Sequence, residues 1–183
     1  MIKIAIIGPE STGKSELAKA LAEYFQAPWV EEYAREYVEK LNREYSFPDI
    51  SNIATKQIEQ ELFYENGCAG NVACVFFDTD LIITKVWFEY CYKQVPAFVT
   101  ERLEEGFFDF YLLCTPDLPW EADAVREHGH DRDFFFDWYK REIEHLKKPY
   151  ALVSGKGGER LQNAIEAVEG RLGSLKEFKS SRV

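Results

Sequence analysis

The sequence predicts an α/β protein of three layers, in which helices cover both faces of a five-stranded parallel sheet. Three observations support this prediction. Short, nearly continuous apolar runs alternate with longer amphipathic segments, a pattern typical of βαβ units. The first apolar run leads directly into a glycine-rich loop. The chain has 183 residues, 46% of them hydrophobic and 30% charged, which suits a single globular domain.

Five segments are predicted to be strands, with helices between them. The predicted strands are Ile2–Ile7, Pro28–Glu31, Val72–Asp78, Asp109–Cys114 and Tyr150–Ser154. The predicted helices are Ser15–Phe25, Glu32–Tyr45, Ile50–Tyr64, Leu81–Tyr92, Pro96–Gly106, Asp131–Lys147 and Gly158–Leu172. Apolar residues recur at helical spacing in the first of these, and Pro96–Gly106 opens with proline and closes with glycine. We expect one domain over residues 1–175 and a frayed polar tail over 176–183.

The net charge of -10 argues against a nucleic-acid-binding surface, because phosphate backbones require stripes of lysine and arginine. No run of 18 apolar residues is present, so no membrane contact is expected. No secretory pattern follows Met1, and Cys68, Cys74, Cys91 and Cys114 form no C-x-x-C pair. We therefore expect a reduced, cytoplasmic protein without disulfides or zinc. The sequence predicts no particular oligomeric state.

Residues 8–15, "GPESTGKS", match the pattern G-x-x-x-x-G-K-[ST] between a predicted strand and a predicted helix. Gly8 and Gly13 let the backbone curl so that successive N–H groups face phosphate oxygens. Lys14 then reaches the β- and γ-phosphates, and the Ser15 hydroxyl ligates Mg²⁺. The motif predicts the P-loop NTPase fold with ATP and Mg²⁺ as cofactors. The expected nucleotide contacts are Gly8, Glu10, Ser11, Thr12, Gly13, Lys14, Ser15 and Glu16.

The third predicted strand, within "VACVFFDTD", ends in Asp78, and Asp80 follows two residues later. An acid at the end of the strand next to the P-loop strand lies close to the metal ion in such folds. We therefore expect Asp78 to share the metal with Ser15. The alternative is that either acid caps the helix that follows, and this alternative is stronger for Asp80 than for Asp78.

The second predicted strand, "APWVEE", delivers Glu31 and Glu32 to the same edge of the sheet. A carboxylate there could accept a proton from a substrate hydroxyl. Adjacent strand residues point to opposite sides, so only one of the two glutamates should face the site. Arg35 lies three residues after Glu32 on the same side of the next helix. The alternative for Glu32 and Arg35 is a solvated ion pair on an acidic helix.

A long connection, rich in proline and charge, follows the fourth strand, and we expect it to form a lid over about residues 117–133. Such a lid excludes water and brings arginine to the transferring phosphoryl group, with Arg126 and Arg132 as candidates. The alternative is that both are ordinary surface arginines. His128, His130 and Asp131 lack further ligands at convincing spacing, which disfavours a metal site there. The aromatic run from Phe134 to Tyr139 is predicted to be the buried face of a helix.

The turn after the last strand, "VSGKGGER", is also rich in glycine. Such a turn can press its backbone against a purine ring, so Gly155 and Arg160 are expected to border the adenine. The alternative is a simple turn between strand and helix. The sequence does not decide between ATP and GTP.

Several of these motifs together resemble the ribosylnicotinamide kinase domain of NadR-type proteins. The resemblance extends from Ile2 to about Leu172 and is carried by "GPESTGKS", "EYAREYVEKL", "FFDTDLIITKVWFEY", "LLCTPDLPWEADAVRE" and the terminal "SG....R". The E-Y-x-R-E segment combined with D-T-D is more specific than the phosphate loop. The resemblance implies transfer of the γ-phosphate of ATP to the 5′-hydroxyl of nicotinamide riboside, giving nicotinamide mononucleotide for NAD salvage.

The resemblance also implies roles for individual residues, to which we add Arg132 from the lid segment and Trp87 from the aromatic residues of this chain. The catalytic set is Lys14, Glu32, Asp78, Arg126 and Arg132, with either Glu32 or Asp78 as the base. The set binding the nucleoside is Glu32, Tyr33, Arg35, Asp80, Trp87, Trp120 and Asp123. Some relatives carry tryptophan where this chain has Glu31, so Trp29, Tyr33, Trp87 and Trp120 all stay candidates for stacking on the nicotinamide ring.

Two other readings stay open at this point. One is a P-loop kinase for another nucleoside or hydroxylated metabolite. The other is a non-catalytic nucleotide sensor, or an NTPase that acts on a partner protein. Two acids and a lid with arginines favour an enzyme with a small acceptor.

Overall fold

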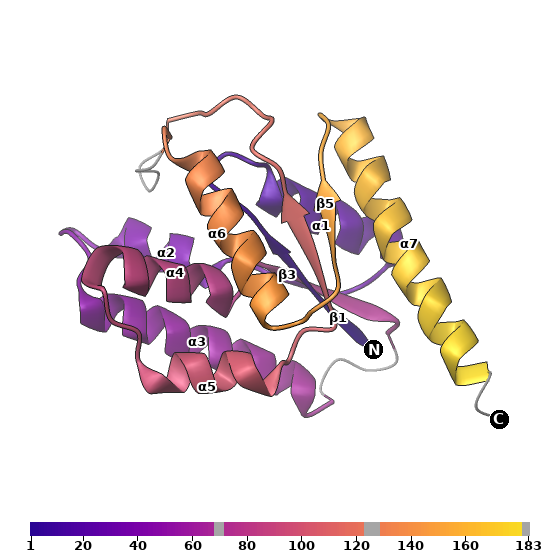
Figure 1. Ribbon diagram of the computed structural model, residues 1–183, viewed down its shortest axis with the longest axis horizontal. Coiled ribbons are helices and arrows are strands. Elements are labelled where there is room, and N and C mark those ends of the chain that lie inside the picture. The colour runs from indigo at the N-terminus through magenta and orange to yellow at the C-terminus, as the bar shows by residue number, and fades with distance from the viewer. Residues whose placement is uncertain (68–71, 123–128, 181–183) are drawn as a thin grey trace.

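A parallel sheet lies between two layers of helices, as the alternating pattern predicts (Figure 1). The structure is a computed structural model that describes residues 1–67, 72–122 and 129–180, with the backbone alone from residue 175 onward. Its five strands have the order β2-β3-β1-β4-β5 and are all parallel. Their bounds are β1 Ile2–Ile7, β2 Trp29–Val30, β3 Cys74–Asp78, β4 Phe110–Cys114 and β5 Tyr150–Val153. The predicted fold class is confirmed.

The helices occupy the predicted segments with some shifted ends. They are α1 Lys14–Phe25, α2 Tyr33–Lys40, α3 Phe47–Glu65, α4 Leu81–Tyr92, α5 Ala97–Glu105, α6 Arg132–His145 and α7 Gly158–Ser180. The second helix ends five residues before the predicted Tyr45, because Leu41 turns to an extended conformation. The third starts earlier than predicted, at a capping box formed by Ser46 and Asp49. The last helix runs on through residues that were predicted to fray.

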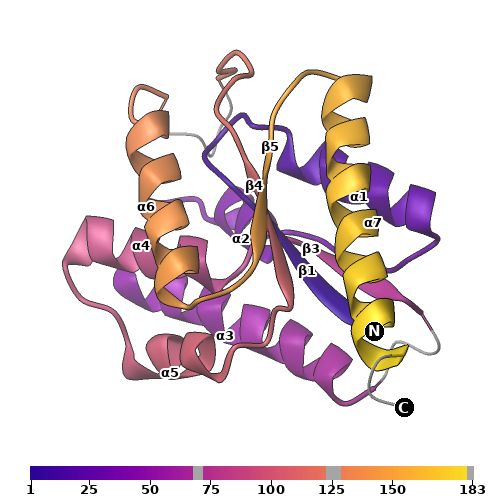
Figure 2. The same cartoon turned by 45° about the vertical axis from the view of Figure 1, so that its right-hand side comes forward.

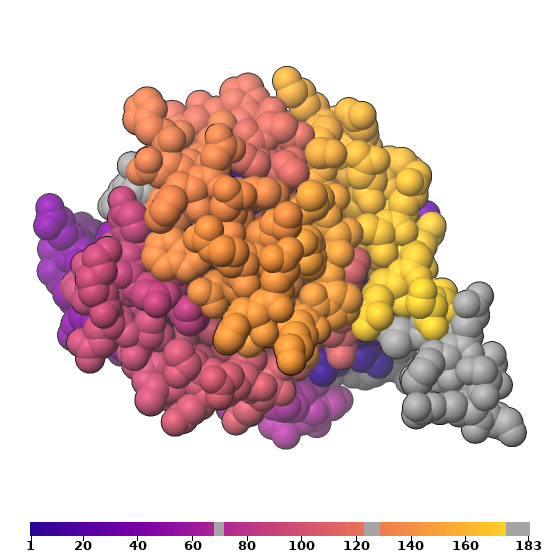
Figure 3. Space-filling view, in the orientation of Figure 1, coloured from indigo at the N-terminus to yellow at the C-terminus, as the bar shows by residue number. Residues whose placement is uncertain are grey.

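Alternate residues of each strand point into two separate cores, one on each side of the sheet. On one side α1 and α7 pack against the sheet, and on the other side lie α3, α4, α5 and α6 (Figure 2). In β1, for example, Ile4 and Ile6 belong to the first core, while Ala5 and Ile7 belong to the second. Figure 3 shows the surface of α6, in orange, between α7 in yellow and the magenta α4–α5 region. No helix within the described ranges combines the length and apolar character needed to cross a bilayer.

The topology brings the predicted motifs to one edge of the sheet. The phosphate loop follows β1, and β3 lies directly beside β1 in the ladder. The chain enters α2 directly after β2, and the lid segment follows β4. Because all strands are parallel, these segments meet at the carboxyl ends of the strands, where α/β folds bind ligands.

Candidate active site

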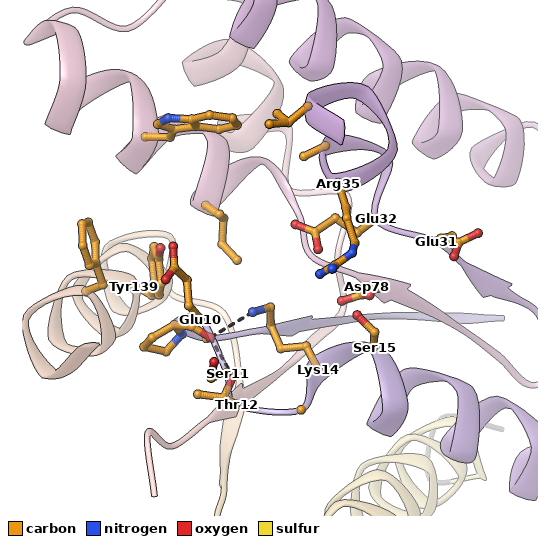
Figure 4. A pocket seen from close by; sticks show the side chains of 18 of the residues that line it. Glu10, Ser11, Thr12, Lys14, Ser15, Glu31, Glu32, Arg35, Asp78 and Tyr139 are labelled. Atoms are coloured by element: carbon orange, nitrogen blue, oxygen red, sulfur yellow. Dashed lines mark hydrogen bonds between the residues drawn. The ribbon is translucent and has the colours of Figure 1, made fainter. Parts of the chain in front are cut away.

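A cavity of about 680 Å³ opens at this edge of the sheet (Figure 4). Residues from the phosphate loop, α1, α2, β3, α4 and α6 line it. The lining residues are Gly8, Pro9, Glu10, Ser11, Thr12, Gly13, Lys14, Ser15, Glu16, Lys19, Glu31, Glu32, Ala34, Arg35, Glu36, Val38, Glu39, Tyr45, Asp78, Ile83, Trp87, Tyr90, Arg132, Phe135 and Tyr139. All eight residues of the G-x-x-x-x-G-K-[ST] motif are among them. The volume lies in the range typical of ligand sites.

The phosphate loop has the backbone that its glycines predict. Gly8 has a φ of 151°, and a Cβ atom there would lie 2.7 Å from the Cys114 carbonyl oxygen. Gly13 has a φ of 71° and forms the N-cap of α1. Lys14 folds back over the loop and donates from its Nζ to the Pro9 carbonyl oxygen at 3.0 Å. Its charge therefore lies at the mouth of a loop whose N–H groups and helix N-terminus attract anions.

Asp78 lies at the end of β3 and is only 4% exposed. Burial raises the pKa of its carboxyl group, while the Lys14 charge and a hydrogen bond from Ser15 oppose this rise. Its Oδ1 atom is buried and has no hydrogen-bond partner among the described residues. A buried carboxylate oxygen without a protein donor, next to a hydroxyl group, suits a hard divalent cation. Ser15 and Asp78 therefore fit Mg²⁺, and their role as its ligands stays a prediction.

The two adjacent glutamates after β2 lie differently. Both line the cavity, but Figure 4 shows Glu32 beside Arg35 above Asp78, whereas Glu31 lies farther from these groups. Arg35 Nε is 3.0 Å from Glu39 Oε1 on the next turn of α2. Of the two, Glu32 therefore has the better position to contact an acceptor hydroxyl near Asp78.

One wall of the cavity is aromatic. Trp87, which the sequence predicted, contacts Tyr45 edge-to-face with 4.7 Å between the ring centroids. Phe135 and Tyr139 are buried, as predicted for that face of α6, and also line the cavity. The prediction was wrong for Phe134, which is 49% exposed because it lies on the outer side of the helix. Tyr90 lies three residues after Trp87 on α4, so helical spacing could have identified it. No sequence signal pointed to Tyr45, which was predicted to end a helix and instead lies in a loop.

Two predicted nucleoside contacts lie elsewhere. The Asp80 side chain caps α4 by accepting the Ile82 N–H at 3.0 Å, and it is only 2% exposed. Burial raises its pKa to about 7. Asp80 and Tyr33 line a separate small cavity behind Asp78, and neither lines the large one. The capping alternative for Asp80 is therefore confirmed.

The residues that were predicted to border the adenine make contacts within the fold. Arg160 is 4% exposed and donates to the carbonyl oxygens of Val153, Gly155 and Thr115. It also forms an ion pair with Asp117, whose Oδ2 accepts the Gly155 N–H at 2.7 Å. These contacts fasten the turn after β5 to the start of the lid segment. Neither Gly155 nor Arg160 lines the cavity. This agrees with the alternative interpretation of the segment as a simple turn between strand and helix.

The described part of the lid segment lies against the phosphate loop. The Glu121 N–H donates to Ser11 Oγ at 3.2 Å, and Trp120 Nε1 donates to Glu10 Oε2 at 3.5 Å. Arg132 begins α6, lines the cavity and donates to the Leu118 carbonyl oxygen at 2.8 Å. Trp120 does not line the cavity itself. The predicted residues Asp123, Arg126 and His128 lie outside the described residues.

Comparison with known proteins agrees with the fold and the motifs. The family described as AAA domain (AAA_28) matches residues 3–160. The trifunctional NAD biosynthesis/regulator protein NadR of Escherichia coli (strain K12) is 32% identical over 137 residues, which cover 71% of this chain and 32% of that protein. NadR of Salmonella typhimurium (strain LT2) is 32% identical over 139 residues, with the same coverage. The match thus spans about a third of these relatives.

Comparison with solved structures also finds NadR proteins. A crystal structure of NadR in complex with NR superposes with a TM-score of 0.73 at 29% identity, covering 94% of this chain and 52% of that one. NadR in complex with NAD and AMP-PNP gives 0.70 at 30% identity, covering 94% and 50%. Thymidylate kinase from Ehrlichia chaffeensis shares the fold, with a TM-score of 0.61 at 12% identity. This match covers 92% of this chain and 97% of that one. The chain therefore belongs to the AAA-domain family AAA_28 and is a homologue of the NadR proteins.

Proposed function

We propose that this chain is an ATP-dependent kinase that phosphorylates the 5′-hydroxyl of nicotinamide riboside and so serves cytoplasmic NAD salvage. One observation carries the proposal. A single cavity joins a complete phosphate loop and Asp78 to Glu32, Arg35 and an aromatic wall. Homology to NadR supports the choice of acceptor, since NadR has been solved with NR, which we take to be nicotinamide riboside. The match covers only about a third of the NadR chain, so we propose the activity for this domain alone.

The phosphate end of the cavity would hold the triphosphate of ATP. Backbone N–H groups of the loop and the Lys14 ammonium surround the β- and γ-phosphates in this arrangement. Ser15 and Asp78 would hold Mg²⁺, which when bound neutralises charge on the β- and γ-phosphates. Arg132 lies on the lid side of the same cavity and adds positive charge for the transferring group.

The acceptor hydroxyl needs a proton acceptor, and we assign this role to Glu32. Asp78 is directed toward Ser15 and the metal position, which leaves Glu32 as the carboxylate above it (Figure 4). The hydroxyl proton passes to Glu32 as the acceptor oxygen bonds to the γ-phosphorus. The bond from phosphorus to the β–γ bridging oxygen breaks, and ADP leaves with that oxygen. Arg35 would position the sugar.

The proposal is tested by ADP release in the presence of Mg·ATP and one candidate acceptor at a time. We expect strong stimulation by nicotinamide riboside and little by uridine, cytidine, thymidine or adenosine. Stimulation by another of these nucleosides would keep the kinase and replace its acceptor. ADP release that no nucleoside stimulates, or ATP binding without release, would contradict the proposal and favour an NTPase or a nucleotide sensor.

A further inference from the structure

The Trp120 side chain contacts both the phosphate loop and the far end of the lid segment. A Cβ atom added at Gly129 would lie 2.7 Å from Trp120 Cε2 and 2.8 Å from its Cδ2, so the indole packs directly on the Gly129 backbone. Trp120 Nε1 also donates to Glu10 Oε2 at 3.5 Å, near the upper limit for such a bond. Trp120 is 39% exposed and does not line the large cavity. Its contacts therefore join segments of the chain and do not fill the core or the site.

The chain on either side of Trp120 rests on the phosphate loop. The Glu121 N–H donates to Ser11 Oγ at 3.2 Å, and the Ser11 hydroxyl in turn donates to the Glu121 carbonyl oxygen at 3.3 Å. On the other side, Leu118 Cδ1 lies 3.3 Å from the place that a Cβ atom would take at Gly13. The start of the lid segment is thus fastened to the loop whose N–H groups face the phosphates.

The position of Arg132 depends on this arrangement. Arg132 lines the cavity, and its Nη1 donates to the Leu118 carbonyl oxygen at 2.8 Å. Leu118 is two residues before Trp120, and Arg132 is three residues after Gly129. The contact between Trp120 and Gly129 therefore holds together the start of α6 and the carbonyl group that orients the arginine. An arginine that is held in advance stabilises charge on a transferring phosphoryl group without first having to reorganise.

We infer that Trp120 is a positioning residue, whose indole packs on Gly129 and thereby holds Arg132 in place for the γ-phosphate. The inference rests on the proposed kinase function and adds a residue that acts without touching either substrate. It gives Gly129 a specific role, because any side chain there would displace the indole. It also gives Trp120 a role other than stacking on the nicotinamide ring.

The first experiment measures kcat and KM with Mg·ATP and nicotinamide riboside. Trp120→Ala should lower kcat by about 10–100-fold, the loss that a small misplacement of a catalytic group causes, while KM for nicotinamide riboside stays the same. When Arg132 is already glutamine, the same change should cause little further loss, because residues that act as a unit are not additive. Phe98→Ala is the control. It removes a ring that is 38% exposed on α5 and should keep the wild-type kcat.

Gly129→Ala tests the contact itself. The added methyl group should displace the indole and lower kcat in the wild-type protein, and it should cost much less when Trp120 is already alanine. Losses that simply multiply in the double variant of Trp120 and Gly129, or in that of Trp120 and Arg132, would overturn the inference. A normal kcat in Trp120→Ala would also overturn it, and each of these results would leave the kinase intact.

A second experiment needs no acceptor, which separates this inference from the proposed function. Equilibrium titration with Mg²⁺ and either AMP-PNP or ADP measures the preference for a nucleotide with a γ-phosphate, which a well-placed Arg132 should increase. Trp120→Ala should reduce this preference by about fivefold or more, and Phe98→Ala should keep it. Equal affinity of the wild-type protein for both nucleotides, or a preference that Trp120→Ala keeps, would overturn the inference. If nicotinamide riboside is not phosphorylated, the proposed function fails, and this titration still decides the role of Trp120.

Discussion

Asp78 lies beside Ile6 in the parallel ladder of β3 and β1. Ile6 is two residues before Gly8, so this register sets the last residue of β3 next to the start of the phosphate loop. The Ser15 hydroxyl, at the other end of that loop, lies beside Asp78 and opposes the rise that burial causes in the pKa of its carboxyl group (Figure 4). The sheet thus fixes the distance between the nucleotide loop and the acid that we assign to the metal.

Asp78→Asn should weaken the use of Mg²⁺. The amide keeps the size of the side chain but removes the charge, so we expect metal affinity to fall by about 10–100-fold, with a matching loss of rate at limiting Mg²⁺. Titration of the rate with Mg²⁺ measures this effect. Asp80→Asn is the matched control, since asparagine caps a helix as well as aspartate does. An equal effect of both changes would contradict the metal assignment.

Glu32→Gln should lower turnover by about 10²–10⁴-fold while KM for ATP stays the same, because the acceptor hydroxyl loses its proton acceptor. Steady-state kinetics with saturating acceptor measures both parameters. Glu31→Gln changes the neighbouring residue in the same way and should have a much smaller effect. A normal rate in Glu32→Gln would remove Glu32 from this role.

Arg102→Met should lower the free energy of unfolding by about 3–5 kcal/mol, because it leaves a buried carboxylate without its partner. Arg102 Nε lies 2.7 Å from Glu61 Oε2, and the two side chains are 8% and 4% exposed. Burial raises the pKa of the Glu61 carboxyl group, and the hydrogen bond and charge of Arg102 oppose this rise, so Glu61 depends on this arginine to stay ionised. Urea denaturation measures the change. Glu65→Gln removes an exposed partner of the same arginine and should cost less than about 1 kcal/mol. Similar values for the two variants would contradict this account.

Asp49 should make the fold sensitive to acid. The Arg43 guanidinium, followed by Ser46, holds the pKa of the Asp49 carboxyl well below its usual range. A depressed pKa in the folded state stabilises the protein above the usual aspartate pKa, and this contribution is lost as the pH falls below about 4. The melting temperature should therefore fall less between pH 6 and pH 3 in Asp49→Asn than in the wild-type protein. Parallel pH profiles of the two proteins would argue against the role of this pair.

Much of the site follows from local sequence patterns. A complete phosphate-loop motif can be recognised from its own residues and the strand and helix that flank it. An apolar strand that ends in an acid identifies Asp78. Asp80 could not be placed in this way. Thr79 has a φ of 71°, and this left-handed turn sends the two acids to different sides. Strand alternation alone would have put both on one side.

Tertiary contacts account for the other differences. Tyr45 reaches the cavity because Asp49 holds the preceding loop through Arg43 and Ser46, a contact that no periodic pattern predicts. Arg160 belongs to a glycine-rich turn that suggested a ligand. Its side chain donates to the carbonyl oxygens of Thr115, Val153 and Gly155. Thr115 follows β4 and Val153 ends β5, and only the folded sheet brings these two residues together.

The central claim is tested most directly by identifying the phosphorylated product. The protein is incubated with Mg·ATP and nicotinamide riboside, and the products are analysed by mass spectrometry. We predict nicotinamide mononucleotide and ADP in equal amounts, and neither product with Lys14→Ala, which lacks the charge at the mouth of the phosphate loop. ADP without a phosphorylated nucleoside, or full activity in Lys14→Ala, would contradict the account.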